Sequence, residues 1–248
     1  MNKLSLEERA ALRESVHRLL SNVSDERAVR AVIETPAGYD QSVWQQLADM
    51  GVVGLIVDEA YGGSGVGPME LEAVMEEVGA ALLCSPLLAS GVLTAALLQA
   101  LADEDANNRW LPRIASGECI GTVVLTGDSG CWTRSGVAVT AEAQGDGWRL
   151  HGHGSFVLHG QNADMLLVLA NVGDDFAVFA LAGDAQGVSV NALPTFDHTM
   201  RMARIEFDGA SAQRLESAQA VSDAVDEALN MALVALAGEQ AGGAQRCL

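Results

Sequence analysis

Residues 145–170, GDGWRLHGHGSFVLHGQNADMLLVLA, combine residue types and spacings that could form a ligand site. A turn is predicted at Asp146-Gly147, and the apolar runs 148–150 and 156–158 predict strands on either side of a glycine-rich corner. A buried strand is predicted at 165–170. Backbone can approach a flat or bulky ligand most closely at three glycines of this segment, Gly152, Gly154 and Gly160.

The same segment contains three histidines, His151, His153 and His159. An H-x-H pattern on a strand places two rings on one face, which is an arrangement that a metal ion can use. No cysteine is close in sequence, and a carboxylate such as Asp164 would have to come from another strand. We therefore expect surface or hydrogen-bonding histidines and no metal site.

The composition restricts the possible partners of the chain. Its 248 residues are 49% hydrophobic and 19% charged, and the formal net charge is −19. This charge argues against nucleic-acid binding and against docking on anionic lipid. The negative net charge does not exclude an anionic small ligand, because backbone amides and helix N-termini bind phosphate.

The cysteines and the apolar segments bear on the cellular compartment. Four dispersed cysteines fit unpaired thiols in a reducing compartment, and the first twenty residues predict an amphipathic helix instead of a signal peptide. Residues 78–102 lack charge and are long enough to span a bilayer. Their alanines and polar residues favour a buried helix pair broken at Ser85-Pro86. We expect a cytoplasmic protein with no membrane contact.

The residue patterns change character twice along the chain. Helical periodicity dominates up to about residue 118, with a capping box formed by Ser5 and Glu8, a helix closed by Gly51 and another begun at Pro68. Short apolar runs divided by glycine-rich turns follow from Cys119 to about Phe207, which favours a small antiparallel barrel or sandwich. Helical periodicity returns from about Ala218. The predicted fold class is α+β.

Four segments in this order resemble the acyl-CoA dehydrogenase family of flavoenzymes. Residues 47–55 are similar to the family's "LaelGllGl" segment, residues 58–63 to its "pEeyGG" turn, and residues 111–118 to its "LP-x-la-s-Ge" link. Residues 145–170 are similar to "dGyvLnGxKxwiTNgxxAdxxlvxA". The resemblance covers nearly the whole chain and spans the change from helices to strands.

The resemblance implies an N-terminal helical domain at residues 1–118, a middle antiparallel β-barrel or sandwich domain at 119–215, and at 216–248 the first helix of a truncated C-terminal helical domain. It also implies FAD as cofactor, an acyl-CoA substrate and electron transfer to an electron-transfer flavoprotein. The reaction of the family removes two hydrogens from the acyl group, with a carboxylate taking the α-proton and FAD the hydride. Such a step requires a polarised carbonyl and a desolvated base.

The cofactor-binding residues carried over from the family lie at the ends of two strands: Leu125, Thr126, Ser129, Phe156, Val157 and Leu158. Thr126 matches the threonine of the family's "TEPxAGSD" loop, and residues 156–159 match its "W-I-T-N". Glycine-rich strand ends also favour phosphate approach, which suits Ser129. The alternative interpretation is an ordinary strand end and turn for Thr126 and Ser129, and plain barrel core for Phe156 and Leu158.

Several positions depart from the family pattern. Gly127 and Asp128 stand where Glu-Pro is usual, and Leu158 replaces a threonine whose hydroxyl serves flavin N5. Ala232 and Leu233 occupy the positions at which some members carry a catalytic glutamate and its neighbouring arginine. Glu239 is another carboxylate, for which we expect a solvated helix face. No residue receives a catalytic assignment.

These losses resemble the degenerate subunit of the heteromeric, α2β2-type acyl-CoA dehydrogenases of bacterial steroid and lipid catabolism. In such enzymes one chain completes the flavin site and its partner is eroded. One alternative is a self-sufficient homo-oligomeric dehydrogenase with its base in the missing C-terminal region. Another is a non-catalytic structural or binding protein on the same scaffold, because fold alone does not fix function.

Overall fold

The first half of the chain is helical in the computed structural model, which describes residues 4–145 and 147–248. Asp146, and with it the predicted turn at Asp146-Gly147, lies outside the described residues. Aspartate and serine side chains accept backbone N–H groups at the starts of several helices, as the N-cap preference predicts. The helices are α1 (Leu6–Val23), α2 (Glu26–Ile33), α3 (Gln41–Asp49), α4 (Pro68–Ala80), α5 (Ala95–Leu101) and α6 (Glu104–Ala115).

The middle of the chain forms one mixed sheet, whose strands are β1 (Gly121–Val124), β2 (Val139–Gln144), β3 (Gly147–Leu158), β4 (Met165–Val172), β5 (Asp175–Ala182), β6 (Val188–Ala192) and β7 (Met202–Arg214). The order is β1-β4-β2-β3-β7-β5, and pairing of β4 with β5 closes the strands into a barrel. The predicted fold class is confirmed. The parallel pairing of β1 with β4 is a feature that the antiparallel expectation did not include.

The glycine-rich corner predicted inside 148–158 is wrong, because β3 runs through it as one strand. Its pairing with β7 shifts register between Leu150 and His151 and again between Gly154 and Val157. A β-bulge absorbs the extra residues and bends the strand without ending it. Phe156 lies in the second irregularity with a φ of +58°, so its side chain leaves the alternation of the strand.

Two elements, α2 and β6, have no counterpart in the predictions. The eight residues of α2 include none that is buried, and β6 alternates only half-buried with exposed positions. Both segments carry an apolar pattern, at the helical spacing in α2 and at every second residue in β6, but each is short.

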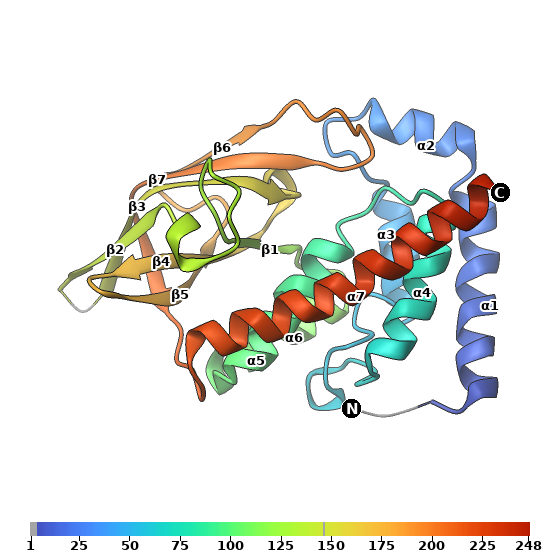
Figure 1. The fold of residues 1–248 in the computed structure, drawn as a ribbon, viewed down its shortest axis with the longest axis horizontal. Helices are drawn as coiled ribbons and strands as arrows, with labels where there is room; N and C mark the ends of the chain where they lie inside the picture. The colour runs from blue at the N-terminus through green and yellow to red at the C-terminus, as the bar shows by residue number, and fades with distance from the viewer. Residues whose placement is uncertain (1–3, 146) are drawn as a thin grey trace.

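The last helix, α7 (Val221–Cys247), packs along α4 and shares one hydrophobic core with the N-terminal helices and with one face of the sheet. Figure 1 shows it crossing the helical half diagonally, from the barrel towards α1. Three glycines allow the backbones of the two helices to lie close together. A Cβ on Gly79 of α4 would lie 1.8 Å from the carbonyl oxygen of Glu239. On α7, a Cβ on Gly242 would lie 1.8 Å from a backbone oxygen of α4, and a Cβ on Gly238 would lie 2.7 Å from another.

The uncharged stretch 78–102 is mostly buried inside the helical half, as expected, although Leu82 and Ala102 are exposed. It comprises the end of α4, a π-helical segment Leu88–Thr94 and α5. The predicted break at Ser85-Pro86 lies within the interruption, which begins earlier, because α4 ends at Ala80 and Leu82 adopts a left-handed φ of +49°. None of the helices in the described part of the chain has the length and hydropathy that a bilayer crossing requires.

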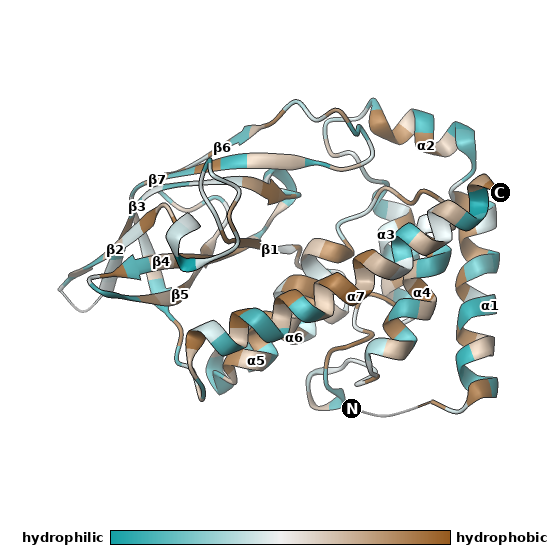
Figure 2. Cartoon of the chain, in the orientation of Figure 1, coloured by the Kyte–Doolittle hydropathy of each residue, from teal (hydrophilic) through white to brown (hydrophobic). Residues whose placement is uncertain are grey.

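The hydropathy of the elements agrees with their burial. Part of the buried strand β1 is coloured strongly hydrophobic in Figure 2, whereas α1 carries mostly hydrophilic residues and buries only Val16 and Leu20. The start of β1 lies where the helical half meets the barrel: Gly121 approaches Thr94, and Thr122 bonds Leu158 at the end of β3. The domain boundaries at 118/119 and 215/216 stay a prediction.

Candidate functional site

β1 and the second half of β3 lie side by side where most of the predicted cofactor residues are found. The backbone N–H of Ser155 donates to the carbonyl oxygen of Thr126 at 2.8 Å, which brings Leu125 and Thr126 beside Phe156. Further along β3, the hydroxyl of Thr122 donates to the carbonyl oxygen of Leu158 at 2.6 Å. The fold thus brings most of the predicted residues together, although their role towards a cofactor remains a prediction.

Thr126 is buried, and its hydroxyl has partners within the chain. Only 4% of its surface is exposed, and its Oγ1 lies 3.3 Å from the carbonyl oxygens of both Gly127 and Gly136. The hydroxyl has one proton to donate, so these acceptors compete with any ligand for it. Thr126 thereby holds together the two ends of the 127–136 loop.

Phe156 is exposed, so the barrel-core interpretation of this residue is wrong. Its side chain is 49% exposed, and a Cβ added to Gly130 would lie 3.7 Å from its ring. The aromatic ring therefore extends over the 127–136 loop, where it offers a face to a planar ligand. Val157 points the other way, into the barrel core.

Ser129 lies on the exposed part of the same loop. Its hydroxyl accepts the backbone N–H of Cys131 at 3.3 Å, which is the local hydrogen bond of a serine turn. The geometry agrees with the ordinary turn interpretation and leaves the side chain at the surface.

Leu158 lines a narrow cavity of about 40 Å³ between β3, α4, the 82–89 segment and α7. The lining is mainly apolar, with Met75, Leu88 and Met200 among the larger side chains. A cavity of this size holds about three water molecules. The chain's own side chains therefore fill most of the space beside Leu158.

Glu239 lines the same cavity, so the expected solvated helix face is wrong for this residue. Burial is the main cause that raises the pKa of its carboxyl group, and the charge of Asp197 raises it further. Helical periodicity alone could not identify this, because the side of α7 that packs against α4 is defined by small residues instead of large apolar ones. Ala232 is buried and Leu233 exposed, so neither position supplies a polar group.

His159 closes the cavity at the end of β3. It has a left-handed φ of +49°, its Nδ1 lies 3.0 Å from the side-chain nitrogen of Asn162, and its ring packs edge-on against Tyr39. Burial lowers the pKa of this histidine to about 4, with Arg201 adding to the effect. His159 is therefore a neutral group between the barrel and the N-terminal helices. Among the described residues, no three His, Cys, Asp or Glu side chains are arranged to hold a metal ion.

A cluster of polar residues that the sequence reasoning did not find surrounds Asp128. Ser155 donates its hydroxyl to Asp128 Oδ1 at 2.5 Å, Arg204 forms an ion pair with the same carboxylate, and His153 Nε2 lies 3.2 Å from Oδ2. Hydrogen bonding from Ser155 is the main cause that lowers the pKa of Asp128. The departure from the family pattern at Asp128 was the available signal, but its partners come from β3 and β7.

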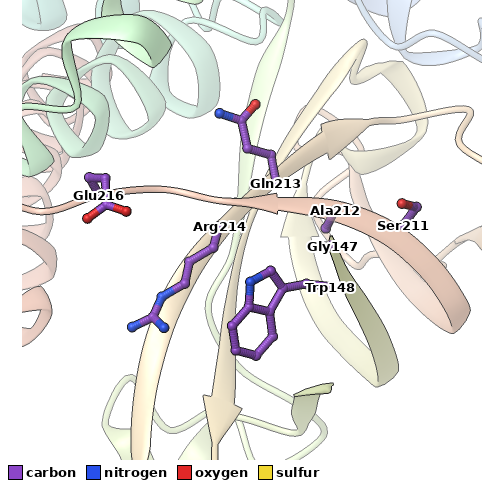
Figure 3. A pocket seen from close by; sticks show the side chains of 7 residues that line it. All are labelled: Gly147, Trp148, Ser211, Ala212, Gln213, Arg214 and Glu216. Atoms are coloured by element: carbon purple, nitrogen blue, oxygen red, sulfur yellow. The ribbon is translucent and has the colours of Figure 1, made fainter. Parts of the chain in front are cut away.

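An open hollow of about 680 Å³ lies at the opposite end of β3, beside Trp148. The guanidinium of Arg214 stands 5.4 Å from the indole centroid, and Figure 3 shows both side chains on the same side of β7. Gln213 points to the other side of the strand in the same view. Because the polar groups do not converge on a common point, this hollow is a weaker candidate than the region around Thr126 and Leu158.

The residues at the ends of β1 and β3 fit a flavin only in part. The exposed ring of Phe156 suits a planar group. The hydroxyl of Thr126 is engaged within the chain, Leu158 has no side-chain donor, and the carbonyl of Leu158 already accepts from Thr122. At these two positions, 126 and 158, the described structure shows no side-chain donor that lacks a partner within the chain.

Comparison with known proteins agrees with this architecture. The sequence profile "Acyl-CoA dehydrogenase, N-terminal domain" matches residues 6–118. The acyl-CoA dehydrogenase IpdE2 of Mycobacterium tuberculosis is 30% identical over 243 residues, which are 98% of this chain and 62% of that protein. The chain thus spans less than two thirds of the length of this relative.

Solved structures give the same picture. The ChsE4-ChsE5 complex from Mycobacterium tuberculosis superposes with a TM-score of 0.84 at 28% identity, over 99% of this chain and 66% of that one. A steroid ACAD variant, Tcur3481-Tcur3483, superposes with a TM-score of 0.83 at 28% identity, over 97% and 64%. With the helical domain, the barrel and the first helix after it all matched, the chain belongs to the acyl-CoA dehydrogenase family.

Proposed function

We propose that this chain is a subunit of a FAD-dependent acyl-CoA dehydrogenase and that it requires a second subunit of the same family to complete a flavin site. The observation that carries the proposal is Leu158, an aliphatic side chain at the end of β3 in a cavity of about 40 Å³. An aliphatic side chain has no hydrogen bond to offer to a flavin, and the cavity beside it leaves little room for an acyl chain.

The relatives support a heteromeric assembly. Two similar structures are complexes of two named chains, and one is described as a steroid ACAD. We infer an acyl-CoA thioester as the substrate of the assembly, with steroid or lipid acyl groups as the class, and an electron-transfer flavoprotein as the acceptor. An α2β2 tetramer in the cytoplasm is the arrangement that this proposal expects.

FAD, when bound, supplies the hydride acceptor for α,β-desaturation of the thioester. The contribution of this chain is to present Phe156 to the planar cofactor and to hold the 127–136 loop through Thr126. We assign no base to the chain, because Ala232 and Leu233 lack acid–base groups.

Co-expression tests the proposal. The full-length protein is purified alone and together with each candidate family subunit, and the flavin absorbance and the acyl-CoA-dependent reduction of a dye are measured. We expect stable flavin binding and turnover only for one pair. Stoichiometric FAD and full turnover in the protein purified alone would contradict the proposal, and an absence of flavin in every pair would favour a non-catalytic scaffold.

One observation favours a second candidate, a self-sufficient dehydrogenase. Glu239 places a carboxyl group of raised pKa in the cavity that Leu158 lines. A desolvated carboxylate there has the properties of a general base. In this alternative the single protein is active and Glu239→Gln abolishes turnover while flavin binding persists. In the heteromeric proposal the same substitution leaves the turnover of the pair unchanged.

A further inference from the structure

Two donors from two strands converge on the carboxylate of Asp128. Arg204 on β7 forms an ion pair with Oδ1, and Ser155 on β3 donates its hydroxyl to the same atom at 2.5 Å. The two donors also lie 3.1 Å apart, from Arg204 Nη1 to Ser155 Oγ. Arg204 is further held by Glu206, 3.2 Å from its Nε. These groups form a rigid pair of donors on paired strands.

His153 adds a third group with unused hydrogen-bonding capacity. Its Nε2 is buried and lies 3.2 Å from Asp128 Oδ2, yet the geometry forms no hydrogen bond with any described residue. Gly127 lies beside the same nitrogen: a Cβ there would be 3.5 Å from it, an ordinary contact distance, but only 2.5 Å from the Cβ of Ala138. A buried nitrogen without a partner is costly unless a ligand or water satisfies it.

Asp128 is the exposed member of the cluster. Its side chain is 64% exposed, whereas that of Arg204 is 29% exposed and Ser155 is buried. Asp128 also lies on a loop, and the donors lie on strands. A stronger anion arriving from solvent therefore displaces Asp128 more readily than it moves the donors. A phosphate offers more acceptor oxygens than one carboxylate and pairs well with arginine.

We propose that Arg204, Ser155 and His153 form a binding site for a phosphate group of a nucleotide, and that Asp128 occupies this site as an internal carboxylate in the free chain. The cluster lies next to Thr126, because Ser155 also bonds the backbone of that residue. Both the diphosphate of FAD and the phosphates of coenzyme A carry the required chemistry. The site is defined by this chain's residues alone, so it stands or falls independently of the heteromeric proposal.

The test measures pyrophosphate binding to the full-length protein by calorimetry at low ionic strength and neutral pH. Asp128→Ala is expected to bind pyrophosphate at least tenfold more tightly than the wild type. The double variant Asp128→Ala/Arg204→Gln is expected to lose this gain. Asp184→Ala removes the same charge from an exposed turn and serves as the matched control. Equal affinities in Asp128→Ala and Asp184→Ala would overturn the proposal, as would a gain that survives Arg204→Gln.

If the alanine variant does not fold, Asp128→Asn replaces it, because asparagine keeps the shape of the side chain and removes its charge. The same gain in pyrophosphate affinity is expected for it. Competition against pyrophosphate then separates the two sources. Displacement of pyrophosphate by FAD and not by coenzyme A assigns the site to the diphosphate of FAD. Displacement by coenzyme A and not by FAD assigns it to the phosphates of coenzyme A. If neither competes, the cluster binds an adventitious ion only and the proposed nucleotide site is wrong.

Discussion

Leu158, at the end of β3, and Glu239, on α7, line the same narrow cavity, although the residues come from the barrel and from the last helix. One removes a hydrogen-bond donor from the position expected to face a flavin, and the other brings a carboxyl group to the same space. Leu158 favours the subunit that needs a partner, and Glu239 favours the self-sufficient dehydrogenase.

Restoring a hydroxyl at position 158 is expected to improve flavin binding. Leu158→Thr returns a donor at the end of β3, and one hydrogen bond contributes about 1 kcal/mol, or roughly fivefold in affinity. The measurement is FAD retention by the assembled pair on dilution, followed by flavin fluorescence. Leu158→Val has the same shape without the hydroxyl, so equal retention in both variants would show that the donor is irrelevant here.

Glu239→Gln is expected to stabilise the fold at neutral and alkaline pH. The raised pKa means that the folded state holds the carboxyl proton more tightly than the unfolded state. The stability from this group is therefore present below its ordinary pKa of 4.5 and is lost as the pH rises. The glutamine resembles the protonated acid at every pH. Melting temperatures at pH 5 and pH 8 should show an advantage for the variant that widens with pH; an advantage confined to pH 5 would refute this.

His159 is expected to destabilise the fold under acid conditions. Its pKa is lowered from 6.5 to about 4 in the folded chain, so the unfolded state binds the proton more readily. The stability from the neutral ring is complete above about pH 6.5 and falls as the pH drops towards 4, by at most about 3 kcal/mol.

Urea unfolding of the wild type and of His159→Asn across this pH range tests the role of the histidine. Asparagine tolerates the left-handed backbone and does not titrate. The variant should show a shallower fall in the free energy of unfolding between pH 6.5 and 4. Identical slopes would assign the acid sensitivity to other groups.

The close packing of α7 on α4 is expected to depend on glycine. Gly79→Ala and Gly242→Ala each place a methyl group 1.8 Å from a backbone oxygen of the opposite helix, which the packed helices cannot accommodate. We expect a loss of several kcal/mol in the free energy of unfolding or insoluble protein. Gly243→Ala meets its nearest atom at 3.7 Å and should be neutral or slightly stabilising. Destabilisation of all three variants to the same extent would argue against specific packing.

Much of the architecture was predictable from the sequence because its signals are local. The capping box at Ser5, the helix start at Pro68 and the buried strand predicted at 165–170, which is observed within β4, each follow from residues close together in the chain. The bulge around Phe156 was not predictable, since it depends on how β3 pairs with β7. Asp128, Ser155 and Arg204 are distant in sequence, so their convergence required the three-dimensional structure.

The central claim is that this chain requires a partner subunit for a complete flavin site. Its most direct test is the flavin-to-protein ratio of the full-length protein, purified alone and as a complex with its candidate partner. We predict negligible flavin in the protein alone and about one FAD for each pair of unlike subunits. One tightly bound FAD for each copy of the protein purified alone would contradict the account.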